Sequence, residues 1–311
     1  MIEKYKYILL GLLTYVPGAH ALLHRGTGGT NSARYCYSTW LRHVVQARVS
    51  GYDLRMGTLA EIGPGDSLGI GLSGLISGFQ NYYAFDHVAH AASQKNLDVF
   101  DELVELFRAR TPVPSDIEFP FLLPKLEHYE FPSSCFPNIA EALEPARLRS
   151  IRSDLETLDG AVRYIAPWQS WKRTVERPVD FIISQAVMEH VDELEDAYAA
   201  MNAWLSPGGI MSHQIDYKSH AMSKRWNGHL SYSDRTWRLM RGRLPYLLNR
   251  STYSIHMSIL KQFGLRQSCE KLVIRTDGID RHELAPAFCN LPEADLKISD
   301  AFIQFVKQFP E

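Results

Sequence analysis

The 311-residue sequence predicts a doubly wound α/β fold, with helices on both faces of a mostly parallel sheet. A buried strand at 58–62 leads through a glycine turn into a helix at 67–77 and a second strand at 81–86, which forms a β-turn-α-β unit. Further strands separated by helical patterns are expected at 162–165, 180–184 and 209–215. This alternation is typical of parallel sheets with right-handed crossovers.

Two regions depart from the alternation. Residues 1–50 are expected to form a helical N-terminal extension, in which 33–49 has the apolar spacing of an amphipathic helix with its N-cap at Asn31-Ser32. The main domain would then span 51–311. Within it, 92–160 interrupts the pattern after the second strand and is interpreted as an insertion over one side of the sheet.

The composition limits the class of partner. Lys and Arg number 33 against 35 Asp and Glu, a net charge of -2, whereas nucleic-acid binding requires a basic surface. We therefore expect no nucleic-acid partner. The four cysteines are far apart, which favours free thiols in the cytoplasm over a zinc site or a disulfide framework: Cys36, Cys135, Cys269 and Cys289.

The most apolar segment lies at 7–23. It is 17 residues long, at the short limit for a membrane span, and is interrupted by Gly11, Pro17 and His20. We expect a helix that packs on the domain or on a partner subunit of a homo-oligomer. The alternatives are weak peripheral contact with the inner membrane and, less favoured, a membrane span.

The glycine turn is the most informative motif. Gly63 and Gly65 follow the first strand and let the backbone approach a ligand at the N-terminus of the next helix. Asp86, at the end of the second strand, is placed to accept hydrogen bonds from ribose hydroxyls and would repel a 2′-phosphate. These features predict an adenosine-containing ligand, and NAD or S-adenosylmethionine would satisfy them equally.

Three further motifs distinguish S-adenosylmethionine from NAD as the ligand. In chain order after Glu61-Ile-Gly-Pro-Gly65 come Asp180-Phe-Ile-Ile-Ser184, Gln185-Ala-Val-Met-Glu-His-Val191 and Ala203-Trp-Leu-Ser-Pro-Gly-Gly-Ile210. Together they resemble class I S-adenosylmethionine-dependent methyltransferases, over about residues 57–275 without the insertion. The resemblance implies a seven-stranded sheet of Rossmann-like type whose last strand is antiparallel, with 269–276 and 300–309 as its final strands.

The resemblance also implies the cofactor site. Its residues would be a turn, a ribose carboxylate and a loop beside the methionine moiety: Glu61, Gly63, Gly65, Asp86, Gln185 and His190. The sequence departs from the family pattern twice. Ser67 replaces the third glycine, where it can still hydrogen-bond at the helix N-terminus. No acidic residue follows the third strand, and Trp168 is interpreted as stacking on adenine, with core packing as the alternative.

The acceptor side is predicted after the fifth strand, because ligands bind outside the carboxyl ends of parallel strands. His213, Asp216, His220 and His229 lie within 17 residues there. A hydroxyl acceptor needs a base, and we expect His220 or His213, tuned by Asp216, to serve. One alternative is that these residues bind a divalent metal ion, although we assign no metal-binding residue from the sequence. The other is that they form an ordinary solvated loop.

A looser resemblance concerns the acceptor. The pattern of His213 to Asp216, His220, Tyr232-Ser233, Trp237 and Asn249-Arg250 is similar to a methyltransferase subgroup found with bacterial surface-polysaccharide enzymes. It implies a sugar hydroxyl as acceptor, aromatic rings for stacking, and an arginine for an anionic group. The substrate-binding candidates are therefore His229, Tyr232, Trp237 and Arg250.

Three hypotheses follow. The first is O-methylation of a sugar or another small hydroxylated metabolite. The second keeps the cofactor but methylates nitrogen or carbon. The third is a non-catalytic, cofactor-binding assembly protein, against which the intact glycine turn and Asp86 argue.

Overall fold

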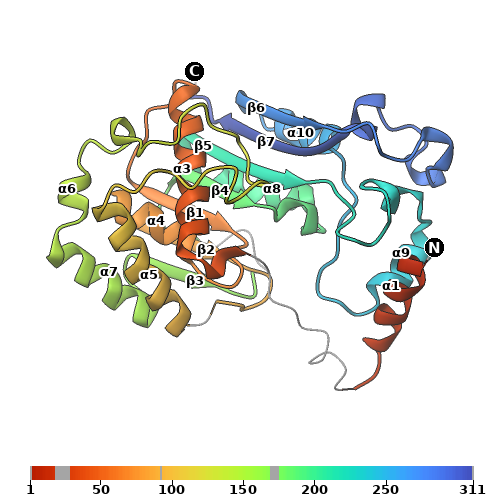
Figure 1. Cartoon of the computed structure of the whole chain (residues 1–311), viewed down its shortest axis with the longest axis horizontal. Coiled ribbons are helices and arrows are strands. Elements are labelled where there is room, and N and C mark those ends of the chain that lie inside the picture. Colours follow the sequence, from red (N-terminus) through yellow and green to blue (C-terminus); the bar gives the residue numbers. More distant parts are fainter. Residues whose placement is uncertain (1, 18–28, 92, 169–174, 310–311) are drawn as a thin grey trace.

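Seven strands form one sheet in the order β3-β2-β1-β4-β5-β7-β6. The computed structural model describes residues 2–17, 29–91, 93–168 and 175–309 (Figure 1). The strands are β1 Thr58–Ile62, β2 Asn81–Phe85, β3 Val162–Ile165, β4 Val179–Gln185, β5 Leu205–Asp216, β6 Arg266–Ile274 and β7 Ile298–Val306. The pairs β1–β2, β1–β4, β2–β3 and β4–β5 are parallel, whereas β7 is antiparallel to β5 and β6. The predicted seven-stranded sheet with an antiparallel last strand is confirmed.

The helices surround this sheet. The α-helices are α1 Ile2–Leu13, α3 Ala33–Val49, α4 Gly69–Ser77, α5 Ser93–Arg108, α6 Ile139–Ala142, α7 Pro145–Thr157, α8 Leu194–Trp204, α9 Asp234–Arg241 and α10 Tyr253–Gln262. Short 3-10 turns are η1 Gly29–Asn31, η2 Ser133–Cys135, η3 Met188–His190, η4 Gly228–Ser231, η5 Arg281–Glu283, η6 Pro286–Phe288 and η7 Glu293–Leu296. The predicted strands at 58–62 and 162–165 match exactly, and the other element ends move by a few residues.

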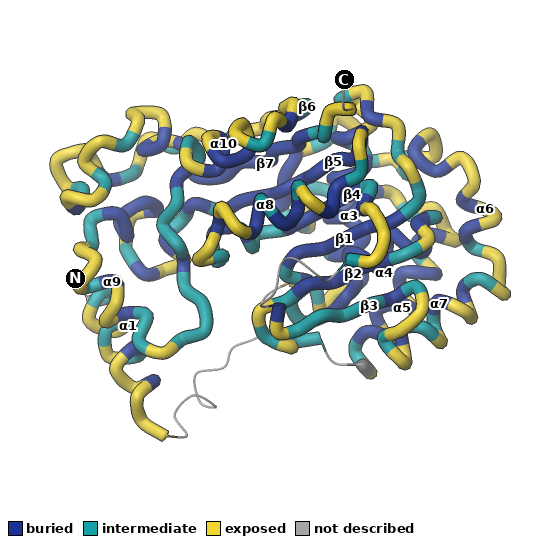
Figure 2. The backbone as a smooth tube through the Cα atoms, turned by 180° about the vertical axis from the view of Figure 1, so that it is seen from behind, coloured by how far each residue is buried: buried dark blue, intermediate teal, exposed yellow. Residues whose placement is uncertain are grey.

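Both faces of the sheet are covered, which confirms the doubly wound fold. Alternate side chains of β1 point to opposite faces, so Leu59 packs with α3, α4, α5 and α7, whereas Ala60 packs with α8 and α10. Strand β1 is therefore buried throughout and its neighbours over most of their length, as Figure 2 shows in dark blue.

The two helices at the N-terminus lie in different places. Helix α3 begins at the predicted cap, where the Ser32 hydroxyl accepts a hydrogen bond from Tyr35 N at 3.3 Å. It belongs to the main core, because the Trp40 ring is fully buried and its Nε1 donates to Ser77 Oγ at 3.0 Å. Helix α1 instead packs on α9, well away from α3 (Figure 1). The boundaries at 1–50, 51–311 and 92–160 stay predictions.

Helix α1 fits closely against α9. A Cβ on Gly11 would lie 2.0 Å from Leu239 O, so only glycine permits this approach. Tyr7 and Ile8 cover a small apolar cluster of Met222, Trp237, Met240 and Leu248. The expected packing on the domain is therefore seen for 2–13, while 18–23 lie outside the described residues. Within the described part of the chain, no helix combines the length and apolar character needed to cross a membrane.

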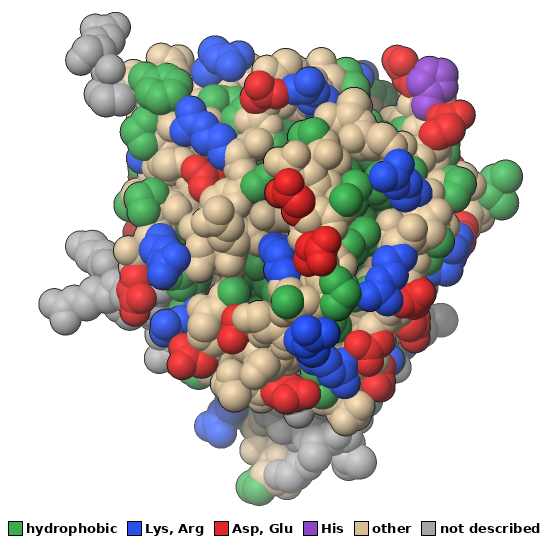
Figure 3. All heavy atoms as spheres, turned by 90° about the vertical axis from the view of Figure 1, so that its left-hand side faces the viewer, with side chains coloured by type: hydrophobic (Ala, Val, Ile, Leu, Met, Phe, Trp, Pro, Cys, Tyr) green, Lys and Arg blue, Asp and Glu red, His purple; other side chains and the backbone are tan. Residues whose placement is uncertain are grey.

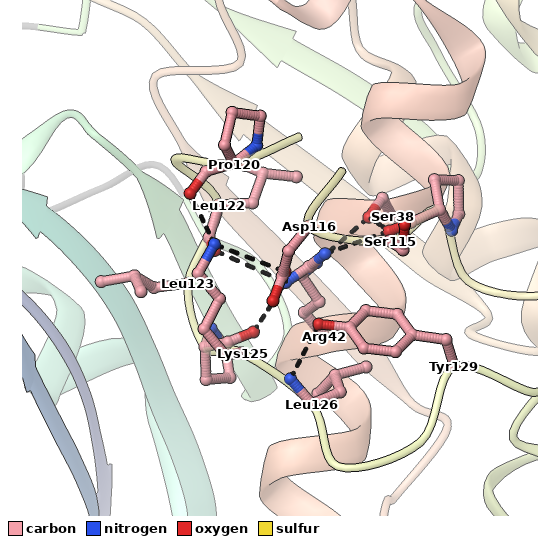
Figure 4. Close-up of polar contacts among 12 residues, drawn as sticks. Ser38, Arg42, Ser115, Asp116, Pro120, Leu122, Leu123, Lys125, Leu126 and Tyr129 are labelled. Atoms are coloured by element: carbon pink, nitrogen blue, oxygen red, sulfur yellow. Dashed lines mark hydrogen bonds and ion pairs between the residues drawn. The ribbon is translucent and has the colours of Figure 1, made fainter. Parts of the chain in front are cut away.

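The proline-rich stretch between α5 and α6 is fixed by a buried arginine of α3. The Arg42 guanidinium, with no exposed side-chain surface, pairs with Asp116 at 2.9 Å and donates to the carbonyls of Pro114 at 3.0 Å and Pro124 at 2.9 Å (Figure 4). Five donors in a planar fork suit this set of acceptors. Within 92–160, this stretch therefore covers α3, while α5 and α7 cover the sheet.

Acidic and basic side chains are mixed on one face of the molecule. The face that carries α6 and α7 shows Lys and Arg interspersed with Asp and Glu (Figure 3). That face therefore does not present a single sign of charge to a polyanion.

Candidate functional site

The glycine turn after β1 is held against two neighbouring strands. Gly63 has φ of +68° and Gly65 of +76°, values that favour glycine. Gly63 N donates to Phe85 O of β2 at 2.8 Å. A Cβ on Gly63 would lie 2.6 Å from the methyl groups of Val187, in the loop after β4. The turn thus brings bare backbone to the carboxyl end of the sheet, as the motif predicts.

Asp86 completes a cradle beside this turn. Its carboxylate accepts from the backbone N–H groups of Val88, His87 and Gly65, yet burial outweighs these bonds and raises its pKa to about 6. The second oxygen, Oδ2, is buried and has no hydrogen-bond partner among the described residues. A buried acceptor without a donor can still take a hydrogen bond, and a ribose hydroxyl would supply one.

Ser67 forms hydrogen bonds within the protein. Its hydroxyl donates to Thr30 O and accepts from Gly69 N at 3.2 Å, and its own N–H donates to Thr30 Oγ1 at 3.2 Å. Asn31 donates to Asp66 at 2.9 Å. The serine therefore ties η1 over the turn, a role that its hydrogen bonds explain without the cofactor, and its binding of the cofactor stays a prediction.

Glu61 and Gln185 also support the turn from within the protein. The fully buried Glu61 carboxylate accepts from Tyr82 Oη at 2.5 Å and Gly71 N at 3.0 Å, and burial raises its pKa to about 7. Gln185 Nε2 donates to Gln214 Oε1 at 2.5 Å. Glu61 thus joins β1 to β2 and α4, so a positioning role fits it better than the predicted cofactor contact, and Gln185 is likewise engaged with its own strand neighbours.

Trp168 packs in the core. Its ring is 6% exposed and lies 5.1 Å from the ring of Phe85 and 5.4 Å from that of Trp204. Both neighbours are core side chains of the face covered by α8, so this packing supports the core alternative, while stacking on adenine stays a prediction.

His213 is also buried away from the site. It lies inside β5, where Nδ1 is 2.8 Å from Ser184 Oγ and the ring faces Tyr198 of α8 at 5.7 Å. Burial lowers its pKa to about 3. The prediction of His213 as a base is wrong, since a side chain enclosed between the sheet and α8 cannot reach a ligand at the strand ends.

Asp216 and His220 do come together at the carboxyl end of β5. His220 Nε2 lies 3.4 Å from Asp216 Oδ2, and Lys218 Nζ lies 3.0 Å from Asp216 Oδ1. Burial would raise the pKa of Asp216, but the bond from His220 and the charge of Lys218 outweigh it and hold the value at about 2. The pair borders an open surface pocket of about 750 Å³.

The backbone at His220 is strained. His220 has φ of 44° and Ala221 of 62°, a left-handed conformation that costs non-glycine residues free energy. Strained residues of this kind are often found at active sites and ligand-binding sites, where the surrounding structure holds them in place. The hydroxyl of Tyr7 in α1 donates to His220 O at 3.3 Å and helps to hold this loop.

Turn η3, after β4, faces the pair. The His190 ring lies 5.1 Å from the His220 ring and 5.8 Å from the Tyr246 ring, and burial lowers its pKa to about 4. Glu189 is 2% exposed, and burial, reinforced by the charge of Asp216, raises its pKa well above the usual range. Sequence reasoning missed Glu189, because nothing in the loop pattern shows which of its side chains turns inward.

The four substrate-binding candidates form one packed cluster. Arg250 lies 4.8 Å from the rings of both Trp237 and Phe288, and it donates to Asp234 at 2.7 Å and to Tyr232 O at 2.9 Å. His229 is buried, 6.1 Å from the Trp237 ring. The prediction that Arg250 binds an anion does not fit, because its guanidinium is already paired and covered on both sides. The Trp237 ring is likewise covered by Arg250 rather than open to a sugar.

Comparisons with known proteins found similarity to solved structures alone. No family model matches it, and no curated protein matches it. It is similar to the N-methyltransferase NodS from Bradyrhizobium japonicum WM9 in complex with S-adenosyl-L-homocysteine, at 12% identity and a TM-score of 0.38 over 87% of each chain.

Two further structures are similar at the same level. An S-adenosylmethionine-dependent methyltransferase from Clostridium acetobutylicum ATCC 824 shows 10% identity and a TM-score of 0.41, over 89% of this chain and 92% of that one. The CurJ carbon methyltransferase shows 14% identity and a TM-score of 0.38, over 88% of this chain and 54% of that one. These likenesses are too distant to support an inference about activity, which we argue from the residues.

Proposed function

We propose that this protein is an S-adenosylmethionine-dependent methyltransferase. The observation that carries the proposal is the cradle at the carboxyl end of β1 and β2, where the Gly63 and Gly65 turn has positive φ values and the buried Asp86 Oδ2 lacks a donor. S-adenosylmethionine supplies an electrophilic methyl group on sulfur, and its adenosine ribose carries the hydroxyl donors that Asp86 needs. Val187 packs on Gly63, so the turn and the loop after β4 lie side by side.

We propose O-methylation of a sugar or another small hydroxylated metabolite, as in surface-polysaccharide biosynthesis. A hydroxyl becomes a good nucleophile only as its proton leaves, and in this proposal His220 accepts that proton. If neutral His220 donates Nε2–H to Asp216, its Nδ1 is the free base. The proton then moves from the acceptor oxygen to Nδ1 as the new carbon–oxygen bond forms, and the electron pair of the broken carbon–sulfur bond stays on sulfur.

An amine acceptor is the second candidate. The Asp216 carboxylate, whose pKa is held at about 2, acts on Glu189 in a largely buried site, and its charge would attract an ammonium group. That group must then lose a proton before its nitrogen can attack the methyl carbon. An amine needs less help from a base than an alcohol does. Full turnover without His220 would therefore favour nitrogen methylation.

The position of α1 supports a further part of the proposal. Its outer side chains Tyr5, Leu9 and Leu12 are exposed, beside Lys4 and Lys6. We propose a cytoplasmic enzyme that touches the inner membrane weakly through this helix. Flotation of the full chain with vesicles containing anionic lipid, against a variant with Leu9→Glu and Leu12→Glu, tests this contact.

Calorimetry tests the proposed cofactor first. We expect S-adenosylmethionine and S-adenosylhomocysteine to bind the wild-type protein and to bind Asp86→Ala much more weakly. A screen of hydroxylated acceptors with cofactor labelled in the methyl group then tests transfer. If neither S-adenosylmethionine nor S-adenosylhomocysteine binds the wild-type protein, the proposal is wrong. Binding without methyl transfer to any acceptor would favour a non-catalytic assembly protein.

A further inference from the structure

His220 and two side chains beside it bring potential metal-ligating atoms close together. One ligand atom from each of Glu189, His190 and His220 lies within 4.8 Å of the others. We propose that these three residues bind one divalent transition-metal ion. The site is defined by protein ligands alone, and its test needs neither cofactor nor acceptor. It gives His220 another role than the base proposed above, because Nδ1 cannot bind a metal ion and accept a proton at once.

The carboxylate of Glu189 is the strongest argument. The side chain is 2% exposed, and although backbone N–H groups of Glu189 and Asp216 approach it, neither oxygen has a hydrogen-bond partner among the described residues. A buried carboxyl group without partners is costly, and native proteins rarely keep one without a ligand. A cation at this point would satisfy both oxygens.

Lys218, whose charge acts on Glu189, is already paired with other carboxylates. Its Nζ is engaged by Asp216 at 3.0 Å and by Asp300. Asp216 contributes a negative charge close enough to act on Glu189. A divalent cation would be attracted by Asp216 and would stabilise the ionised form of Glu189, whereas a neutral ligand would do neither.

Asp216 has the position of a supporting residue for a metal ligand. It lies against Nε2 of His220, and histidine ligands commonly direct their second ring nitrogen at a carboxylate that fixes the ring. Nδ1 of His220 is then the nitrogen left for the ion. The strained backbone at His220 holds the ring in this orientation.

The donor set indicates the class of ion. Two imidazoles and one carboxylate suit Zn²⁺, Mn²⁺ or Co²⁺, whereas Mg²⁺ and Ca²⁺ prefer oxygen ligands throughout. Three protein ligands leave at least one position open, as in catalytic rather than structural sites. An acceptor oxygen could occupy it, and His220 would then be a ligand and not the base.

A second cluster in the described chain serves as a matched control. Asp280, His282 and Glu283 also group three ligand types, but they are exposed. Their carboxylates have partners: Asp280 and Glu283 form a reciprocal capping box, and Glu283 also pairs with Arg225 at 3.2 Å. This cluster is explained without an ion.

Titration of the metal-free full-length protein with ZnCl2 and with MnCl2, followed by calorimetry, tests the site without cofactor or acceptor. We expect one ion per chain and at least tenfold weaker binding by Glu189→Gln and by His220→Ala. His282→Ala should bind as the wild type does. The visible spectrum of bound Co²⁺ in the wild-type protein provides a readout that needs no variant.

Two results would overturn the site. One is the absence of stoichiometric binding of all three ions by the wild-type protein. The other is binding that Glu189→Gln and His220→Ala leave intact. Circular dichroism of each variant shows that a loss of binding is not a loss of fold. Because no methyl transfer is measured, failure here leaves the proposed methyltransferase activity standing, and failure of that activity leaves the metal site standing.

Discussion

Asp216 Oδ2 lies 3.4 Å from His220 Nε2 at the carboxyl end of β5, where the two side chains form a carboxylate–imidazole pair. The pKa of Asp216, about 2, keeps the carboxylate charged across the physiological range, so it can orient the ring and stabilise its protonated form. We predict that His220→Ala lowers kcat for methyl transfer by roughly 10²- to 10⁴-fold, the usual contribution of a positioned base. The affinity for S-adenosylhomocysteine, measured by calorimetry, should not change.

His282→Ala is the control for this prediction, because it removes an exposed histidine of η5. Asp216→Asn should fall between the two variants in kcat, since the ring remains but loses its charged partner. Wild-type turnover by His220→Ala would show that the acceptor needs neither a base nor a metal at this position.

The pKa of Asp86 gives the cofactor affinity a pH dependence. Burial raises this pKa from 3.8 to about 6, and the carboxylate must be ionised to accept two hydroxyl donors from a ribose. We predict that affinity for S-adenosylhomocysteine is constant above about pH 7 and falls as the pH drops through 6. Calorimetry between pH 5 and pH 8 measures the effect.

Asp86→Asn separates this residue from other titrating groups. The amide has nearly the same shape but no charge, so the variant should bind more weakly at pH 8. Between pH 5 and pH 8 it should lose the pH dependence that the wild type shows around 6. A variant that keeps the full wild-type dependence would contradict the assignment to Asp86.

Local sequence patterns predicted the sheet and the cradle well. The strand at 58–62, the turn at Gly63 and Gly65, and Asp86 at the end of β2 follow from features within a few residues of each other. His213 was recognisable as an interior residue, because the predicted strand at 209–215 already contained it. The prediction nevertheless placed His213 in the acceptor site, because the many polar residues of that segment were given more weight than its strand pattern.

Contacts between distant segments were not predictable in this way. Ser67 meets Thr30, which is 37 residues away, and Arg250 meets Asp234 and two aromatic rings. Each of these side chains is hydrogen-bonded to or packed against a partner that the local sequence pattern does not reveal. The inward turn of Glu189 likewise depends on how η3 packs against the end of β5.

The contact between Gly63 and Val187 leads to a prediction about stability. Gly63 and Gly264 have the same φ of +68°, but a Cβ on Gly264 meets nothing within 4 Å, whereas one on Gly63 lies 2.6 Å from Val187. We predict that Gly264→Ala costs about 1 kcal/mol of unfolding free energy from backbone strain alone. Gly63→Ala should cost about 1–3 kcal/mol more, because its methyl group overpacks the turn.

Urea denaturation of both variants measures the difference. Adding Val187→Ala to Gly63→Ala should restore part of the lost stability, since it removes the methyl groups that clash. Equal costs for the two glycine variants would show that the turn relaxes away from the loop after β4.

Arg42 and Arg34 lie on the same helix, α3, and differ in burial. Arg42 has no exposed side-chain surface and binds Asp116 and two proline carbonyls, whereas Arg34 is 45% exposed and pairs with Glu118. Removing Arg42 leaves buried carbonyls without donors, so Arg42→Ala should cost about 3–5 kcal/mol of unfolding free energy. Arg34→Ala should cost less than about 1 kcal/mol, because solvent screens an exposed pair.

Arg42→Lys refines this comparison, since it keeps the positive charge but not the planar fork of donors. We expect most of the loss to remain in this variant, because one ammonium cannot reach Asp116, Pro114 and Pro124 together. Hydrogen exchange should also show faster exchange at 114–124 in Arg42→Ala than in Arg34→Ala. Similar unfolding free energies for the two alanine variants would mean that the stretch between α5 and α6 is held by its apolar contacts with α3, such as Tyr35 against Phe119, and not by the guanidinium.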